Sequence, residues 1–288
     1  MKNDNNNRQA MKKMHNYVRR VIQLIFFIFF PSIFTAAFSG IKEIFTKIGS
    51  GDLVELSGFV MTLIVVCAFT VVFGRFFCGF ACAFGSFGDF CHGTYLFICR
   101  KLKKKPYKAA FLEHKALSWV KYIVLLLIVA GTFTGVYSKI TGAGLSPWEV
   151  FSMLTVFKFR FSDYIPGIII LLLIMVGMTL SERFFCRVLC PMGAVFSLLP
   201  ILPGFAVRRD RSKCIKGCSA CLNNCPMNVE LPDSKSDGTG DCIMCGKCED
   251  ICPVNNPKGK FIKTNDVRFT ILRAILLVVI LLLYKYVV

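Results

Sequence analysis

Five long apolar runs leave this chain few ways to fold. Helices and closed barrels are the structures that satisfy their own backbone hydrogen bonds inside a lipid bilayer, and runs of this length are typical of membrane-spanning helices. The composition agrees, because 55% of the 288 residues are hydrophobic, only 18% are charged, and the mean hydropathy is +0.60. We therefore predict a membrane α-helical protein with about five transmembrane helices. The runs are Val21–Phe38, Leu56–Gly74, Tyr122–Tyr137, Ile165–Leu180 and residues 270–288.

Lysine and arginine are concentrated between these runs. Six fall in residues 1–20 and eight in residues 100–121, but only two in residues 41–57 and three in residues 139–163. The positive-inside rule places the first two of these segments in the cytoplasm. We therefore predict a multi-pass protein of the cell (inner) membrane, with its N-terminus and residues 207–268 inside and its C-terminus outside. This topology explains most of the net charge of +18, so we expect no nucleic acid as a partner.

The apolar runs divide the chain into six segments. Pro31 lies inside the first run and predicts a kink there. The polar, Asn-rich tail before that run is expected to be mobile. In chain order the segments are a cytoplasmic tail (1–17), spans one to three (18–141), an extracytoplasmic interfacial segment (142–163), span four with a second cysteine pair (164–206), a cytoplasmic cysteine-rich domain (207–265) and span five (269–288).

Eight cysteines fall in two four-cysteine motifs within residues 207–265. "CIMCGKCEDICP" (242–253) has the spacing C-x2-C-x2-C-x3-C-P, and "CIKGCSACLNNCP" (214–226) repeats it with one extra residue in its first gap. This is the spacing of bacterial ferredoxins, in which three thiolates of a motif hold one [4Fe–4S] cluster and the fourth holds the other. We therefore predict a small α+β ferredoxin-like domain with two [4Fe–4S] clusters. The ligands are Cys214, Cys218, Cys221 and Cys252 for cluster 1, and Cys242, Cys245, Cys248 and Cys225 for cluster 2. Two zinc sites are the alternative, but the proline that ends each tandem motif argues against them.

A second cysteine pattern occurs twice, 108 residues apart. "RFFCGFACAFG" (75–85) and "RFFCRVLCPMG" (183–193) each follow an apolar run that we expect to run inward. We interpret the two copies as a parallel internal repeat. Arg75 and Arg183 stand three residues before each pair, where we expect their charge to lower the pKa of the thiols.

The duplicated pairs predict a composite site at the cytoplasmic face. If each copy stays helical, cysteines at i and i+4 share one face, and two copies together supply four thiols. Such a set suits a further metal or iron–sulfur centre, or a pair of redox-active dithiols. The alternative is that these cysteines only fill apolar space. The four residues are Cys78, Cys82, Cys186 and Cys190.

Membrane spans, a duplicated C-x3-C pair and a two-cluster domain together resemble the NapH, NosR and CcoG group of polyferredoxins. The resemblance covers about residues 18–265, and length and layout are closest to NapH. It implies multi-pass membrane electron transfer with cytoplasmic clusters. The chain departs from the family at Ala83, where the family has proline, which puts the rigidity of the first half-site in doubt.

The expected function is a membrane-bound iron–sulfur electron-transfer protein. It would relay electrons between a cytoplasmic or quinol donor and a membrane or extracytoplasmic redox partner, as a subunit rather than a stand-alone enzyme. Membrane lipid or an acidic electron carrier is the expected partner of "KLKKK" (101–105). One alternative is a thiol or iron–sulfur metal (copper) reductase, or an assembly factor for a respiratory oxidoreductase, with the paired cysteines as the working site. A structural scaffold for a reductase complex is another.

Overall fold

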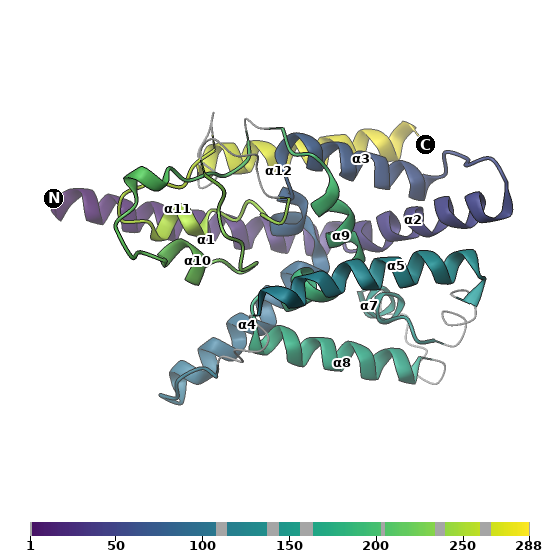
Figure 1. The fold of residues 1–288 in the computed structure, drawn as a ribbon, viewed down its shortest axis with the longest axis horizontal. Helices are drawn as coiled ribbons and strands as arrows, with labels where there is room; N and C mark the ends of the chain where they lie inside the picture. Colours follow the sequence, from purple (N-terminus) through teal and green to yellow (C-terminus); the bar gives the residue numbers. More distant parts are fainter. Residues whose placement is uncertain are drawn as a thin grey trace. The chain divides into compact units, whose positions relative to one another are not determined.

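The computed structural model describes residues 2–107, 114–136, 144–155, 164–202, 205–233, 240–259 and 266–287. These residues are mostly helical and belong to two compact units (Figure 1). Unit 1 consists of residues 1–28, 67–81 and 196–288, and unit 2 of residues 29–66 and 82–195.

The polar tail is helical. Helix α1 runs from Lys2 to Phe29, and the mobility expected for residues 1–17 remains a prediction. His15, Arg19 and Gln23 are buried one turn apart, which puts them on one face of the helix. The Gln23 amide donates a hydrogen bond of 3.1 Å to the Gly79 carbonyl, and the Arg19 guanidinium lies 5.8 Å from the centre of the Phe80 ring. Buried polar contacts within unit 1 therefore hold the middle of α1.

The chain breaks at Pro31, as its position predicted. Helix α1 ends at Phe29 and α2 begins at Ile33, so the first apolar run is divided between two helices. Helix α2 continues to Ser50, where Gly51 adopts a left-handed conformation and donates to the Ile48 carbonyl. A glycine in this conformation is a common helix terminator, because it has no Cβ to clash.

The other apolar runs are helices close to their predicted bounds. Helix α3 is Gly58–Phe73 and ends where Gly74 has a φ of +68°, and α8 is Ile165–Leu180. Helix α5, Val120–Phe133, continues a 3-10 turn that begins at Lys115. Helix α12 covers Val267–Val287. Helix α7, Pro147–Thr155, lies in the segment expected to be interfacial, and residues 142–143 and 156–163 of that segment lie outside the described residues.

Fewer helices meet a strict length test for crossing a membrane than the five expected. By length and composition, one helix of the described segments qualifies, Lys115–Phe133, or two if Ala10–Phe29 and Ile33–Ser50 form a single broken span. Gly58–Phe73 and Ile165–Leu180 are apolar but shorter. Five transmembrane helices therefore remain a prediction.

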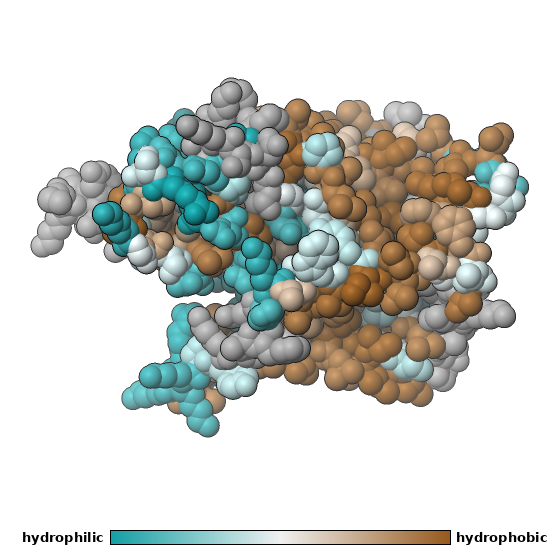
Figure 2. Space-filling view, in the orientation of Figure 1, coloured by the Kyte–Doolittle hydropathy of each residue, from teal (hydrophilic) through white to brown (hydrophobic). Residues whose placement is uncertain are grey.

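Unit 2 is held together by helix pairs and by aromatic side chains. Helix α4, Ala83–Lys101, packs on α8, and α8 packs on α7. Gly88 permits the first contact, because a Cβ there would lie 2.8 Å from the Met178 sulfur. Figure 2 shows an apolar surface over α5 and α8. The large side chains exposed there are Ile123, Leu126, Leu127, Ile165, Ile169, Leu172, Leu173 and Val176.

Unit 1 contains the cysteine-rich segment and α12. Two short helices that pack together, α10 (Ala220–Asn223) and α11 (Lys247–Ile251), carry parts of the two motifs. Strand pairing in the described part of this segment is limited to isolated bridges, Arg208 with Lys258 and Arg209 with Asp233, so the α+β architecture remains a prediction. The start of α12 lies against the end of α3, where the Phe73 and Phe269 rings are 6.4 Å apart (Figure 1).

Candidate iron–sulfur sites

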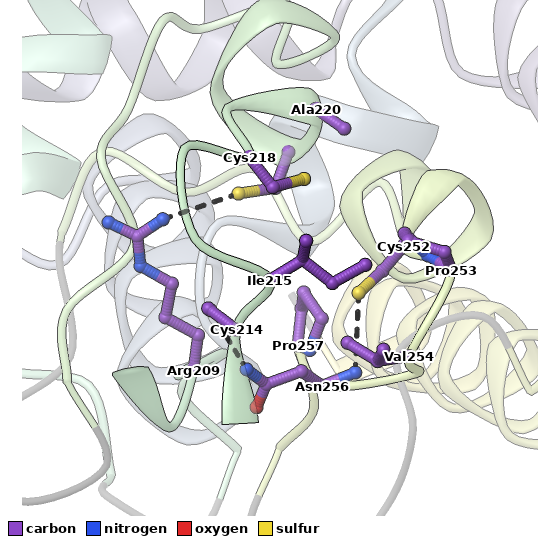
Figure 3. Close-up of a pocket in the computed structure, with 11 residues that line it drawn as sticks. Arg209, Cys214, Ile215, Cys218, Ala220, Cys252, Pro253, Val254, Asn256 and Pro257 are labelled. Carbon is purple, nitrogen blue, oxygen red and sulfur yellow. Dashed lines mark hydrogen bonds between the residues drawn. The ribbon is translucent and has the colours of Figure 1, made fainter. Parts of the chain in front are cut away.

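Two pockets in unit 1 divide the eight motif cysteines in the crossed pattern. The cluster 1 pocket is lined by three cysteines of the first motif and the last cysteine of the second (Figure 3). The cluster 2 pocket is lined by three cysteines of the second motif and the last cysteine of the first, and Cys221 borders it as well. The cysteines are Cys214, Cys218, Cys221 and Cys252 in the cluster 1 pocket, and Cys225, Cys242, Cys245 and Cys248 in the cluster 2 pocket. Each pocket therefore offers four thiols, the donor set that a [4Fe–4S] cluster requires.

The extra residue of the first motif is absorbed in a turn. Gly217 has a φ of +75°, and the Cys218 amide donates to the Ile215 carbonyl at 3.1 Å. The second motif turns at Gly246, with a φ of +72°, which begins α11. Left-handed glycines let the backbone reverse within three residues, so each loop wraps its own pocket.

The two pockets differ in their surroundings. Cys218 of the cluster 1 pocket is exposed, whereas Cys245 of the cluster 2 pocket is buried. Val207, Leu231 and Met244 form a buried apolar cluster against which Cys221, Cys242 and Cys248 pack. The cluster 1 pocket therefore lies nearer to solvent, and the cluster 2 pocket lies in an apolar setting.

Burial controls the thiols of the cluster 2 pocket. It raises the pKa of Cys242 to about 12, with a further rise from the neighbouring Cys245. Burial also raises the pKa of Cys225, and it raises that of Cys248 well above the ordinary thiol value. Such thiols hold their protons at neutral pH, so iron must displace protons when it binds.

Each motif ends in a turn that sequence analysis missed. Asn228 and Asn255 stand three residues after the last cysteine of each motif, and both have a positive φ. The next residue in each case donates its backbone N–H to the cysteine sulfur, Val229 to Cys225 and Asn256 to Cys252, both at 3.4 Å. The signal was present in the sequence as a repeated C-P-x-N, since asparagine tolerates the left-handed conformation better than most residues.

Two side chains donate to sulfurs of the cluster 1 pocket. The Asn256 amide lies 3.1 Å from the Cys214 sulfur (Figure 3). The Arg209 guanidinium lies 3.5 Å from the Cys221 sulfur. Donors to sulfur fix the thiolates and favour the reduced form of an iron–sulfur cluster. The Asn256 contact joins residues 42 positions apart and the Arg209 contact joins residues 12 positions apart, outside the gaps within the motifs, so the motif spacing gave no sign of them.

The paired cysteines do not lie on regular helices. Cys78 is in a π-helical turn, Phe77–Ala81, and Cys186 is in the corresponding turn, Phe185–Leu189. Cys82 and Cys190 are extended residues that begin α4 and α9 (Pro191–Leu198). The assumption that each pair shares a helical face is therefore wrong. The duplication is nevertheless real in the structure, because both copies adopt this same sequence of turn, extended cysteine and helix.

Arg183 links two of these cysteines within unit 2. Its guanidinium forms a two-pronged ion pair with Asp89, at 2.7 and 2.6 Å, and lies 4.0 Å from the Cys186 sulfur. Burial lowers the pKa of Arg183, but Asp89 and the thiolate charges of Cys186 and Cys82 outweigh it and hold that pKa above its usual value. A cation beside a thiol stabilises the thiolate form, and the lower thiol pKa expected from Arg183 remains a prediction. Cys78 belongs to unit 1, and the composite site of four cysteines remains a prediction.

Within the described residues, no three histidine, cysteine, aspartate or glutamate side chains form a group that is suited to a single metal ion.

Comparison with known proteins supports the iron–sulfur interpretation. A family model described as a 4Fe-4S binding domain matches residues 55–106 and 165–208, which contain the two cysteine pairs. A model described as a 4Fe-4S dicluster domain matches residues 206–253, which contain all eight motif cysteines. No solved structure matches the chain.

Two relatives with known names are similar to the chain in sequence. The ferredoxin-type protein NapH of Haemophilus influenzae is 26% identical over 66% of this chain and 63% of its own length. The regulatory protein NosR of Stutzerimonas stutzeri is 26% identical over 60% of this chain, but over only 22% of its own length. The chain is similar to polyferredoxins of the NapH and NosR type. An uncharacterised protein of Methanocaldococcus jannaschii is similar over a larger part of the chain, with 28% identity over 82% of it and 83% of that protein. The matched domains and relatives support an iron–sulfur electron-transfer protein that binds iron–sulfur clusters.

Proposed function

We propose that this protein relays single electrons through two [4Fe–4S] clusters at a membrane. Electrons enter from a cytoplasmic or quinol donor and leave to a membrane or extracytoplasmic redox partner. The observation that carries the proposal is the crossed lining of the two pockets, since the last cysteine of each motif lines the pocket of the first three cysteines of the other motif. A cluster in each pocket supplies one-electron chemistry, and the protein supplies the ligands and their environment.

The exposed apolar surface supports the membrane part of the proposal. Only 6% of the apolar window in Lys115–Phe133 is buried, and α8 exposes large aliphatic side chains as well. Soluble monomers rarely expose apolar patches of this extent. The lysines of the basic segment 101–105 are exposed, which suits contact with lipid headgroups.

Metal analysis of the full chain, purified anaerobically in detergent, tests the proposal. We expect about eight iron and eight sulfide per chain, because each cubane holds four of each. Cys99→Ser, outside both ligand sets, is the matched control and should keep the full content. A colourless protein that contains zinc would exclude the proposal.

A second function, metal reduction at the paired cysteines, is favoured by Arg183, which contacts the Cys186 sulfur of the second copy and interacts electrostatically with Cys82 of the first. The double variant Cys78→Ser/Cys186→Ser separates the two functions. A relay alone predicts that the reduced variant still passes electrons to ferricyanide and to a soluble copper(II) complex at the normal rate. A reductase predicts that copper reduction is lost while ferricyanide reduction persists.

A further inference from the structure

Arg75, the first residue of the first repeat copy, contacts the loop that carries the cluster 2 ligands. Its side chain is fully buried in unit 1. The guanidinium lies 3.1 Å from the Asp241 carboxylate and 3.4 Å from the Gly240 carbonyl. Asp241 directly precedes Cys242, so a buried cation lies beside the first ligand of the second motif.

The two repeat copies explain why Arg75 reaches this loop. In the second copy, Arg183 pairs with Asp89, a residue of the first copy. The position equivalent to Asp89, 108 residues later, is Ser197, which has no charge to offer Arg75. Gly240 packs against the Ser197 backbone so closely that a Cβ would lie 2.1 Å from its carbonyl oxygen. Asp241 of the cysteine-rich loop thus supplies Arg75 with a carboxylate, as Asp89 does for Arg183.

Two glycines let the loop approach this closely. A Cβ on Gly74 would lie 2.4 Å from the Met244 side chain, and a Cβ on Gly79 would lie 2.4 Å from the Ile243 carbonyl oxygen. Residues 74–79 therefore pack closely against the loop between Cys242 and Cys245, and Cys78 is one of these residues.

We propose that Arg75 is a positioning residue that also raises the reduction potential of cluster 2. The proposal rests on the proposed function, because it requires a cluster at Cys225, Cys242, Cys245 and Cys248. Uptake of one electron adds one negative charge to the thiolate-bound group. A buried guanidinium stabilises that added charge, and the effect is strong because little water screens it.

The electrostatics of Cys242 agree with this role. Burial and Cys245 raise its pKa, whereas the charge of Arg75 lowers it. Arg75 therefore favours negative charge on this sulfur. Asp241 opposes it, since its carboxylate offsets part of the guanidinium charge beside the same ligand.

Opposite shifts from two substitutions distinguish a charge effect from simple loss of fit. Arg75→Gln should lower the cluster 2 potential, and Asp241→Asn should raise it. Arg75→Lys retains the charge and should stay close to the native value, and Arg75→Gln/Asp241→Asn should fall between the single variants. The measurement is an EPR-monitored dithionite titration of the full chain, with cluster 2 identified as the signal that Cys225→Ser alters.

Arg209→Gln is the matched control, because Arg209 contacts Cys221 of the cluster 1 pocket. It should shift cluster 1 and leave cluster 2 unchanged. Shifts of the same sign in Arg75→Gln and Asp241→Asn, loss of cluster 2 iron in all Arg75 and Asp241 variants alike, or no shift at all would each overturn the proposal. Absence of cluster signals in the native chain would instead refute the proposed function itself.

Discussion

Cys225 belongs to one motif by sequence and to the other by position. It follows α10 of the first motif, yet it lines the pocket of Cys242, Cys245 and Cys248. We therefore predict that Cys225→Ser changes the EPR signal and lowers the iron content of cluster 2 while cluster 1 persists. Serine is a poor ligand for this iron, so loss of up to about four iron is expected.

Cys214→Ser provides the reciprocal control, since Cys214 lines only the cluster 1 pocket. It should alter cluster 1 and spare cluster 2. If Cys225→Ser and Cys214→Ser disturb the same signal, each motif binds its own cluster and ligation is not crossed.

Asn256 joins two ligands of cluster 1 through sulfur hydrogen bonds. Its side chain donates to Cys214 and its backbone N–H donates to Cys252. Asn256→Ala removes the side-chain donor and should lower the cluster 1 potential, because the reduced form loses more stabilisation than the oxidised form. A differential loss of about 1.4 kcal/mol corresponds to about 59 mV for one electron. Redox titration measures the shift.

Asn223→Ala is a suitable comparison, because the Asn223 amide donates to the Ser219 hydroxyl and not to a sulfur. Its clusters should keep native potentials. An unchanged cluster 1 potential in Asn256→Ala would show that this hydrogen bond has no redox role.

Motif spacing predicted the candidate ligands but not the residues that act on them. The short gaps between the cysteines of each motif can be read directly from the sequence, and they predicted the two crossed groups that line the two pockets. Arg75, Arg209 and Asn256 reach sulfurs or ligand loops through tertiary contacts, up to 166 positions apart for Arg75 and Asp241. No local pattern encodes such contacts, because each depends on how distant segments pack.

Among the elements, the repeated turns show where local reasoning ends. The apolar run 165–180 correctly predicted the first and last residues of α8. A long apolar run with a proline near its start favours a single helix. Cysteines at i and i+4 share a helical face only if the turns after α3 and α8 stay regularly helical, but both turns are π-helical and end in an extended cysteine. The Cys190 amide bonds five residues back, to Phe185, so the cysteine leaves the helical path before α9 begins. Hydrophobic spacing does not distinguish a π-helical turn from an α-helical one.

The two repeat copies have matching turns, and a composite site built from the cysteines of both copies is a testable prediction. If Cys78, Cys82, Cys186 and Cys190 form one centre, Cys78→Ser/Cys82→Ser should cost as much as the quadruple variant, because half a ligand set does not hold the centre. The other pair variant, Cys186→Ser/Cys190→Ser, should do the same. Iron, sulfide and EPR signals beyond those of the two ferredoxin-type clusters are the measurement.

Cys67→Ser/Cys91→Ser controls for loss of two thiols, since neither residue belongs to a repeated pair. It should leave these signals intact. Losses that add between the two pair variants would indicate two separate sites. No loss in any variant would return the cysteines to a packing role.

At the scale of the whole molecule, the side of the membrane on which the C-terminus lies depends on whether α12 crosses the bilayer. Its 21 residues extend about 31 Å, close to the thickness of a bilayer core. Arg273 is buried, and its guanidinium lies 4.5 Å from the centres of the Phe76 and Phe269 rings, so the charge within the helix faces unit 1. On the opposite side, residues 271–283 expose aliphatic side chains, as suits contact with lipid. They are Ile271, Leu272, Ile275, Leu276, Val279, Leu282 and Leu283.

We therefore predict that α12 crosses the membrane and that the C-terminus is extracytoplasmic. Alkaline phosphatase fused after Val288 should be active, because this reporter requires export. The same reporter fused after Asp266, which directly precedes α12, should be inactive, since the cysteine-rich segment is expected in the cytoplasm. The two fusions differ by a single helix, so their contrast reports on that helix alone. Equal activity at both positions would mean that α12 lies along the membrane surface or packs only against unit 1.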